Sequence, residues 1–301
     1  MMTLFTGLSA FSITPTDVVG RVDATALSGL LERISTAGVN SIGLLGSTGG
    51  YAFLSREERR RAVEIARDSV GGRVPVIVGV GALRTDEAET LARDARTAGA
   101  DGLLLAPMSY TLLREEEVFQ HISAVAGAGD LPLCIYNNPG TTRFVFSEDL
   151  IARLAQMPNI AAIKMPLPAD NDFRGELARL RAHTPTDFAI GYSGDWGAAE
   201  SLLAGGDAWY SVIAGLLPAQ ARALATAAMA GDRLEAERLD RAFQSLWDLF
   251  REFGSFRVMY ALAEALGLCR AIPPRPILPL DAGAAARVEA ALEHIGANIR
   301  P

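Results

Sequence analysis

Short apolar runs alternate along the chain with amphipathic segments of helical period. Apolar residues recur with a spacing of three and four at Leu27, Leu30, Leu31 and Ile34. This spacing predicts helices with one buried face, whereas short, continuously apolar runs between helices are typical of buried strands. Eight such strands are predicted, near Leu8–Ile13, Ser41–Leu45, Pro75–Val80, Gly102–Leu105, Leu131–Tyr136, Ile160–Lys164, Phe188–Tyr192 and Ala208–Val212.

The order of these elements predicts a parallel sheet. A helix follows each strand, in units of about 30 residues, and parallel neighbours need such a crossover connection. Eight units favour an α/β fold of the closed (β/α)8 TIM barrel type. An open doubly wound sheet is the alternative, but no Gly-x-Gly-x-x-Gly motif with a downstream acidic partner follows an early strand.

The chain from Pro218 onward is almost wholly helical in pattern, which predicts a helical extension packed on the barrel. The stretch Pro273-Pro274-Arg275-Pro276 is a stiff connector within it. We therefore expect two parts, 1–217 with the strands and most barrel helices, and 218–301 with the last barrel helix and the extension. The helices expected in the second part are 219–230, 234–253, 256–266 and 284–295.

Composition narrows the classes of partner. The net charge is -7 and there is no basic tract, so nucleic acid and anionic membranes are not expected to bind. Cys134 and Cys269 are far apart, which predicts reduced thiols and a cytoplasmic protein. The first residues have no cationic head, so neither a signal peptide nor a spanning helix is expected. The three histidines are isolated from one another, and we expect no metal site.

Lys164 is the only lysine among the 28 basic residues, and it stands in the apolar stretch Ile160–Met165. Burial among apolar side chains disfavours the charged ammonium form of a lysine. A neutral amine attacks carbonyl carbons and forms Schiff bases, which a guanidinium group does not do. The alternative is a snorkelling lysine at a strand end in a chain whose composition favours arginine.

Three further candidates follow predicted strands, whose carboxyl ends form the mouth of such a barrel. Ser47 and Thr48 lie in the turn 46–50, where hydroxyls and backbone N–H groups suit a small carboxylate. A phosphate loop is less compatible, since the Gly-Lys-Ser/Thr ending is missing. A plain glycine-rich turn before a helix capped by Ser55-Arg56-Glu57-Glu58 is the structural alternative. Tyr136 could move protons beside the amine, or simply pack at the mouth.

These residues carry a family resemblance. The motifs Gly46-Ser47-Thr48-Gly49, Tyr136-Asn137-Asn138-Pro139, Ile163-Lys164 and Gly194-Asp195 occur in an order that resembles the dihydrodipicolinate synthase and N-acetylneuraminate lyase family. The resemblance implies a homotetramer or homodimer, and class I aldolase chemistry on pyruvate or a related 2-keto acid and an aldehyde. It implies no metal and no cofactor beyond a covalent imine on Lys164. Tyr136 would be the acid and base, and Ser47 and Thr48 would hold the keto-acid carboxylate and relay protons.

The chain also departs from the family pattern. Gly50 replaces a common glutamate of the turn, and Thr141 occupies the position of an arginine that, in the synthases, grips the carboxylate of aspartate semialdehyde. A hydroxyl cannot replace that bidentate fork. Arg143 lies two residues away and is expected at the surface. Tyr110 is the candidate for the family's relay tyrosine.

The residues expected to select the aldehyde are Asp195, Trp196 and Tyr210, and Trp196 favours a partner less polar than a sugar. Trp209 and Tyr210 alternate on one strand, so only one of them can point inward. The sequence thus predicts a Schiff-base lyase or aldolase with an aldehyde other than aspartate semialdehyde. The alternatives are 4-hydroxy-tetrahydrodipicolinate synthase, a decarboxylating dehydratase of a deoxy-keto sugar acid, and a non-catalytic keto-acid-binding barrel.

Overall fold

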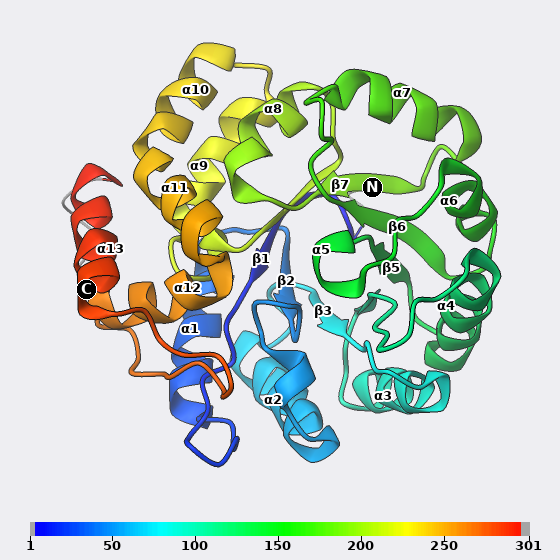
Figure 1. Cartoon of the computed structure of the whole chain (residues 1–301), viewed down its shortest axis with the longest axis horizontal. Coiled ribbons are helices and arrows are strands. Elements are labelled where there is room, and N and C mark those ends of the chain that lie inside the picture. Colours follow the sequence, from blue (N-terminus) through cyan, green and yellow to red (C-terminus); the bar gives the residue numbers. More distant parts are fainter. Residues whose placement is uncertain (1–3, 296–301) are drawn as a thin grey trace.

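A computed structural model describes residues 4–295 and contains a closed parallel barrel in which each strand pairs with its neighbours in chain order. β8 pairs with β1 and closes the ring (Figure 1). The predicted (β/α)8 barrel and its strands are confirmed. The strands are β1 (Gly7–Phe11), β2 (Ser41–Leu44), β3 (Val76–Gly79), β4 (Gly102–Leu105), β5 (Leu133–Tyr136), β6 (Ile160–Met165), β7 (Ala189–Tyr192) and β8 (Ala208–Ser211).

Helices surround the barrel, and α11 to α13 lie together on one side of it (Figure 1). The α-helices are α1 (Ala24–Thr36), α2 (Arg56–Val70), α3 (Thr85–Thr97), α4 (Glu115–Gly129), α5 (Pro139–Thr142), α6 (Glu148–Ala155), α7 (Phe173–His183), α8 (Ala198–Leu203), α9 (Pro218–Met229), α10 (Arg233–Ala242), α11 (Gln244–Phe253), α12 (Ser255–Ala265) and α13 (Ala282–Ile295). Short 3-10 turns are η1 (Tyr51–Phe53), η2 (Asp195–Gly197) and η3 (Ile213–Gly215).

The helical extension follows the predicted pattern with one difference. The single helix expected over 234–253 is two helices, because the Phe243 amide donates to Asp240 O at 3.0 Å, one residue short of the α-helical partner. The Phe243 ring stacks on Trp247 with centroids 4.9 Å apart, which holds the break in place. The division into 1–217 and 218–301 remains a prediction, and its ends, 1–3 and 296–301, lie outside the described residues. Among residues 4–295, none of the helices combines the length and apolar character needed to cross a bilayer.

The strands separate two apolar cores. Alternate residues point into the barrel, where Cys134, Ala162 and Tyr210 belong to the inner cluster, or outward against the helices, where Trp209 is packed. Of the two aromatic residues on β8, Tyr210 therefore points inward. Lys164 follows Ala162 by two positions, so the same alternation turns its side chain into the barrel, at the carboxyl end of β6.

The turn after β2 is held close to the backbone of β3. Leu45 has a positive φ of 55°, which turns the chain over the barrel mouth at the start of the loop with Ser47 and Thr48. Gly79 makes this approach possible, because a Cβ atom there would lie 1.8 Å from Leu45 O. Placement of the loop therefore depends on the absence of a side chain at Gly79.

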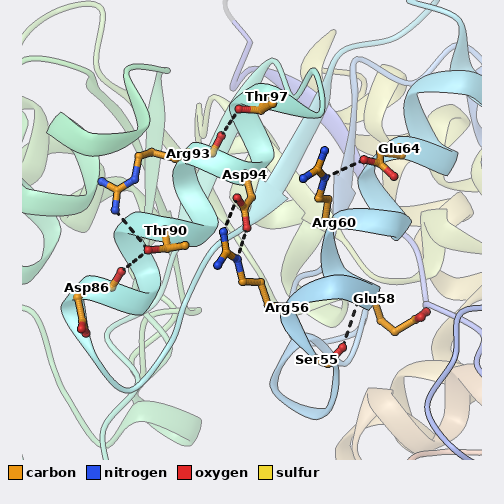
Figure 2. Close-up of polar contacts among 10 residues, drawn as sticks. All are labelled: Ser55, Arg56, Glu58, Arg60, Glu64, Asp86, Thr90, Arg93, Asp94 and Thr97. Atoms are coloured by element: carbon orange, nitrogen blue, oxygen red, sulfur yellow. Dashed lines mark hydrogen bonds and ion pairs between the residues drawn. The ribbon is translucent and has the colours of Figure 1, made fainter.

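Helix α2 is fixed at its start and along one side (Figure 2). The Glu58 amide donates to Ser55 Oγ at 3.3 Å, as the predicted cap requires. A capping box also requires the Glu58 carboxylate to accept from the backbone amide of Ser55. This half of the prediction is wrong, since that carboxylate accepts from the backbone amide of Val22 at 2.6 Å. Farther along, the Arg56 guanidinium forms a two-pronged ion pair with Asp94 of α3, which joins neighbouring helices of the outer ring.

Replacing Gly79 by Ala should lower the free energy of unfolding by about 3 kcal/mol or more, because the added Cβ atom would overlap the backbone carbonyl of Leu45. Gly127→Ala is the matched control: Gly127 lies in α4 with nothing within 4 Å of the added Cβ, and Ala should stabilise that helix by up to about 1 kcal/mol. Urea unfolding of both variants checks this, and equal stabilities would refute the assignment.

Candidate active site

Lys164 lies at the base of the barrel mouth and is only 3% exposed. Its Nζ atom is 4.0 Å from the centroid of the Phe11 ring and 4.2 Å from that of Tyr136. Aromatic faces attract a cation, yet they offer no hydrogen-bond acceptor to an amine as strong as a carboxylate would. The amine is therefore packed between two aromatic rings.

The parallel register places Tyr136 next to Lys164. The Cα atoms of these two residues are partners across β5 and β6. The side-chain amide of Asn138 donates from Nδ2 to the Tyr136 hydroxyl oxygen at 3.0 Å. A phenol oxygen that accepts this bond keeps its own proton free to donate elsewhere. Asn138 was not predicted as a site residue. The signal for it is Pro139 at the start of α5, which turns the chain back over the mouth directly after β5.

A cavity of about 610 Å³ opens above Lys164, at the carboxyl ends of the strands. Seven of the predicted site residues line it: Ser47, Thr48, Tyr136, Thr141, Lys164, Asp195 and Trp196. The structure thus brings together residues from the ends of β2, β5, β6 and β7, as expected for chemistry at a barrel mouth. Arg143 is exposed and does not belong to the cavity lining, which agrees with the expected surface role.

Asp195 lines the cavity, but its carboxylate is already occupied. The oxygens accept from the Trp209 indole at 3.0 Å and from the amides of Val212 and Ile213 at 3.1 and 2.7 Å. Ser211 Oγ adds a longer contact at 3.5 Å. Burial raises the pKa of this carboxyl, and the hydrogen bonds oppose that rise. The bonds join the end of β7 to the end of β8 and so help to shape the mouth.

Two predicted residues lie outside the cavity lining. Tyr210 forms part of the barrel interior below Lys164, with its ring centroid 5.7 Å from Nζ and its hydroxyl 3.4 Å from Cys134 Sγ. Burial raises the pKa of the Tyr210 hydroxyl well above its ordinary value, so this phenol stays protonated. Tyr110 is 96% exposed on the loop after β4. Its part in a proton relay stays a prediction.

Sequence reasoning missed the apolar part of the lining. Leu167, Phe250 and Phe256 face the same cavity, the last two from α11 and α12. Their helical spacing predicts a buried face, but periodicity does not say that these helices reach the barrel mouth. A bend at Gly254, between α11 and α12, brings this segment over the mouth.

Known proteins match this chain in sequence and fold over almost its full length. The model of the dihydrodipicolinate synthetase family matches residues 4–295. A 4-hydroxy-tetrahydrodipicolinate synthase from Methylococcus capsulatus is 36% identical over 288 residues, which cover 94% of this chain and 96% of that protein. The crystal structure of a dihydrodipicolinate synthase from Agrobacterium tumefaciens has a TM-score of 0.97 and 61% identity, and covers 98% of this chain and 99% of that one.

A third relative was solved with a ligand. The chloride-inhibited dihydrodipicolinate synthase from Acinetobacter baumannii, complexed with pyruvate, has a TM-score of 0.88 at 31% identity. It covers 97% of this chain and 99% of that one. A match of this extent, together with a lysine and a tyrosine side by side at the barrel mouth, confirms the predicted family and enzyme class. The chain belongs to the dihydrodipicolinate synthetase family and is a lyase of the aldolase type.

Proposed function

We propose that this enzyme forms a Schiff base between Lys164 and pyruvate, or a related 2-keto acid, and makes or breaks a carbon–carbon bond to an aldehyde. The observation that carries the proposal is the buried Lys164 amine with Tyr136 beside it, at the base of an open cavity. The Acinetobacter baumannii relative complexed with pyruvate supports the choice of keto acid.

The chemistry follows from these two groups. The Lys164 amine adds to the ketone carbon, and loss of water leaves an iminium ion. The positive nitrogen withdraws electrons from the iminium carbon. The methyl group of pyruvate, which is attached to this carbon, can therefore lose a proton, and an enamine results. Tyr136 is placed to deliver and remove the protons of these steps, because Asn138 binds its oxygen and leaves its proton free. The covalent imine supplies the electron sink, so this sequence of steps calls for no metal or cofactor.

The keto-acid carboxylate would bind at the turn after β2. Thr48 is buried and Ser47 half-buried, and both line the cavity. Their hydroxyls can donate to a carboxylate, and the same hydroxyls can carry a proton to or from Tyr136. The Gly50 amide is bonded to Ser47 O at 3.1 Å, which holds the turn in a compact form. This is the role that the sequence predicted for the two residues.

The aldehyde is proposed to differ from aspartate semialdehyde. Thr141 lines the cavity where the synthases of the family carry an arginine, and its hydroxyl donates to Asn138 O at 3.3 Å. It therefore offers no cation to a second carboxylate. The second candidate function is 4-hydroxy-tetrahydrodipicolinate synthase, which is favoured by the name of the 36% identical relative from Methylococcus capsulatus. A decarboxylating dehydratase would share the same imine and is distinguished by its product.

Self-association forms part of the proposal, as a homotetramer or homodimer. Two apolar side chains on the loop after β4 support it: Tyr110 is 96% and Leu112 68% exposed. Neighbouring exposed apolar groups of this size are typical of surfaces that another molecule covers.

Borohydride reduction in the presence of pyruvate should add one reduced pyruvate to Lys164, detectable by intact mass and peptide mapping. Lys164→Arg keeps the charge but cannot form the imine, so it should yield no adduct and lose at least on the order of 10³-fold in kcat. Tight pyruvate binding to the wild type without any adduct would contradict the proposal and favour a binding protein.

Tyr136→Phe should lower kcat by about 10²- to 10⁴-fold, because the proton donor is lost while the ring against Lys164 remains. Tyr192→Phe is the matched control, since the Tyr192 hydroxyl donates to Glu176 at 2.7 Å, away from the cavity. Steady-state kinetics with a fixed aldehyde, together with the rate of adduct formation, measure the effect. Equal activities of the two variants would remove Tyr136 from the mechanism.

Thr141→Arg should raise kcat/KM for the condensation of pyruvate with aspartate semialdehyde by at least about tenfold, since it restores a cation for the second carboxylate. The wild type should be poor in the same coupled assay. Efficient wild-type turnover would instead establish the synthase activity and overturn the proposed difference in substrate.

A further inference from the structure

We propose that the aldehyde is uncharged and carries an apolar, preferably aromatic, group, which binds against a wall formed by Leu167, Trp196, Phe250 and Phe256. This inference rests on the proposed Schiff-base function and names the class of its second substrate. The four residues line the same cavity as Lys164 and Tyr136. Together they form the apolar wall of the cavity.

The apolar wall presents side chains that water would not favour. Trp196 is 40% exposed and lines the cavity, so part of its indole ring faces the open space. Phe256 is half-buried and touches Phe53 and Tyr260, with ring centroids 6.3 and 5.1 Å apart. These contacts hold the Phe256 ring at the edge of the cavity. Apolar and aromatic lining with a few placed polar groups is the usual composition of a small-molecule site.

Phe256 lies beside the turn at Gly50. Gly50 has a φ of +64°, and a Cβ atom there would already lie 3.5 Å from Phe256 Cζ. The ring of Phe256, from α12, therefore packs at van der Waals distance from the turn that carries Ser47 and Thr48.

Each charged side chain of the cavity lining already has a bonding partner or a proposed role. Among the described residues that line it, Lys164 is the one cation and Asp195 the one carboxylate. Lys164 is assigned to the keto acid, and Asp195 accepts hydrogen bonds from Trp209, Val212 and Ile213. A second substrate with its own carboxylate or phosphate would bury a charge without a partner, which is costly.

Polar side chains of the lining are also partly used. Ser193 Oγ donates to Met165 O at 3.0 Å, and Thr141 Oγ1 donates to Asn138 O. Asn138 donates in turn to Tyr136. These groups hold the mouth together, so fewer remain for the hydroxyls of a sugar-like aldehyde. The apolar wall lines the same cavity and has no such bonds to give up.

The reaction with such an aldehyde is balanced as follows. The enamine carbon on Lys164 attacks the aldehyde carbon and forms the new bond, while the aldehyde oxygen takes up one proton, which Tyr136 can supply. Water then hydrolyses the iminium ion and releases a 4-hydroxy-2-keto acid and the free amine. The water consumed equals that lost when the imine formed. In the reverse direction, the same steps cleave such an acid to pyruvate and the aldehyde.

The test compares three aldehydes with pyruvate and the full-length enzyme: benzaldehyde, 4-carboxybenzaldehyde and glyceraldehyde. Product mass and initial rates should give benzaldehyde a kcat/KM at least about tenfold above each of the other two. Equal or better turnover of the charged or the hydroxylated aldehyde would overturn the inference. Borohydride trapping with pyruvate separates the two levels: an adduct without benzaldehyde turnover refutes the substrate class alone, whereas absence of the adduct refutes the proposed function.

Variants of the apolar wall locate the preference. Phe256→Ser and Trp196→Ala should each lower the ratio of kcat/KM for benzaldehyde to that for glyceraldehyde by about tenfold, through a higher KM for benzaldehyde. Leu234→Ser is the control, since Leu234 is 81% exposed on α10 and does not line the cavity. An unchanged ratio in both wall variants would overturn the assignment. If a variant does not fold, the wild-type panel still decides the substrate class.

Discussion

The alignment of Tyr136 with Lys164 across neighbouring parallel strands is the constraint on which the site depends. Because the two Cα atoms are partners in the β5–β6 ladder and both side chains point into the barrel, the phenol ring and the amine must meet. Phe11 closes the other side of the amine from β1. A one-residue slip of β6 would turn Lys164 outward, toward the helices. The reactive pair is thus a property of the barrel register, and the hydrogen bonds of the whole sheet maintain it.

Around this pair, two sets of contacts fix the loops of the barrel mouth. The turn with Ser47 and Thr48 is pressed against β3 at Gly79, and Asp195 ties the ends of β7 and β8 together through buried hydrogen bonds. Buried, fully bonded polar groups of this kind specify one arrangement. The turn proposed to bind the keto-acid carboxylate therefore has a defined position, which suits a step that requires the carbonyl carbon to lie close to the amine.

Much of the fold and of the candidate site was predictable from the sequence. The rest was not predictable, and the reasons are physical. Apolar runs and helical spacing predicted the strands and the barrel, and the solitary lysine of an apolar strand, chosen as a candidate, does line the cavity. Residues next to strand ends, such as Thr48 and Tyr136, could be placed because strand direction fixes where they lie. Asp195 was predicted as a substrate contact, yet its oxygens accept backbone and indole bonds that depend on how β8 ends. Phe250 and Phe256 were missed because the packing angle of α11 and α12 on the barrel is set by distant contacts.

The bend at Gly254 also gives the cavity two origins in the chain. Lys164, Tyr136 and the turn with Ser47 and Thr48 belong to strand ends before residue 165, whereas Phe250 and Phe256 belong to a helix pair that contributes no strand to the barrel. Substitutions in this pair can change the lining of the cavity and leave the strands intact. Variation in α11 and α12 could thus change which molecules the cavity admits, while Lys164 and Tyr136 stay in place.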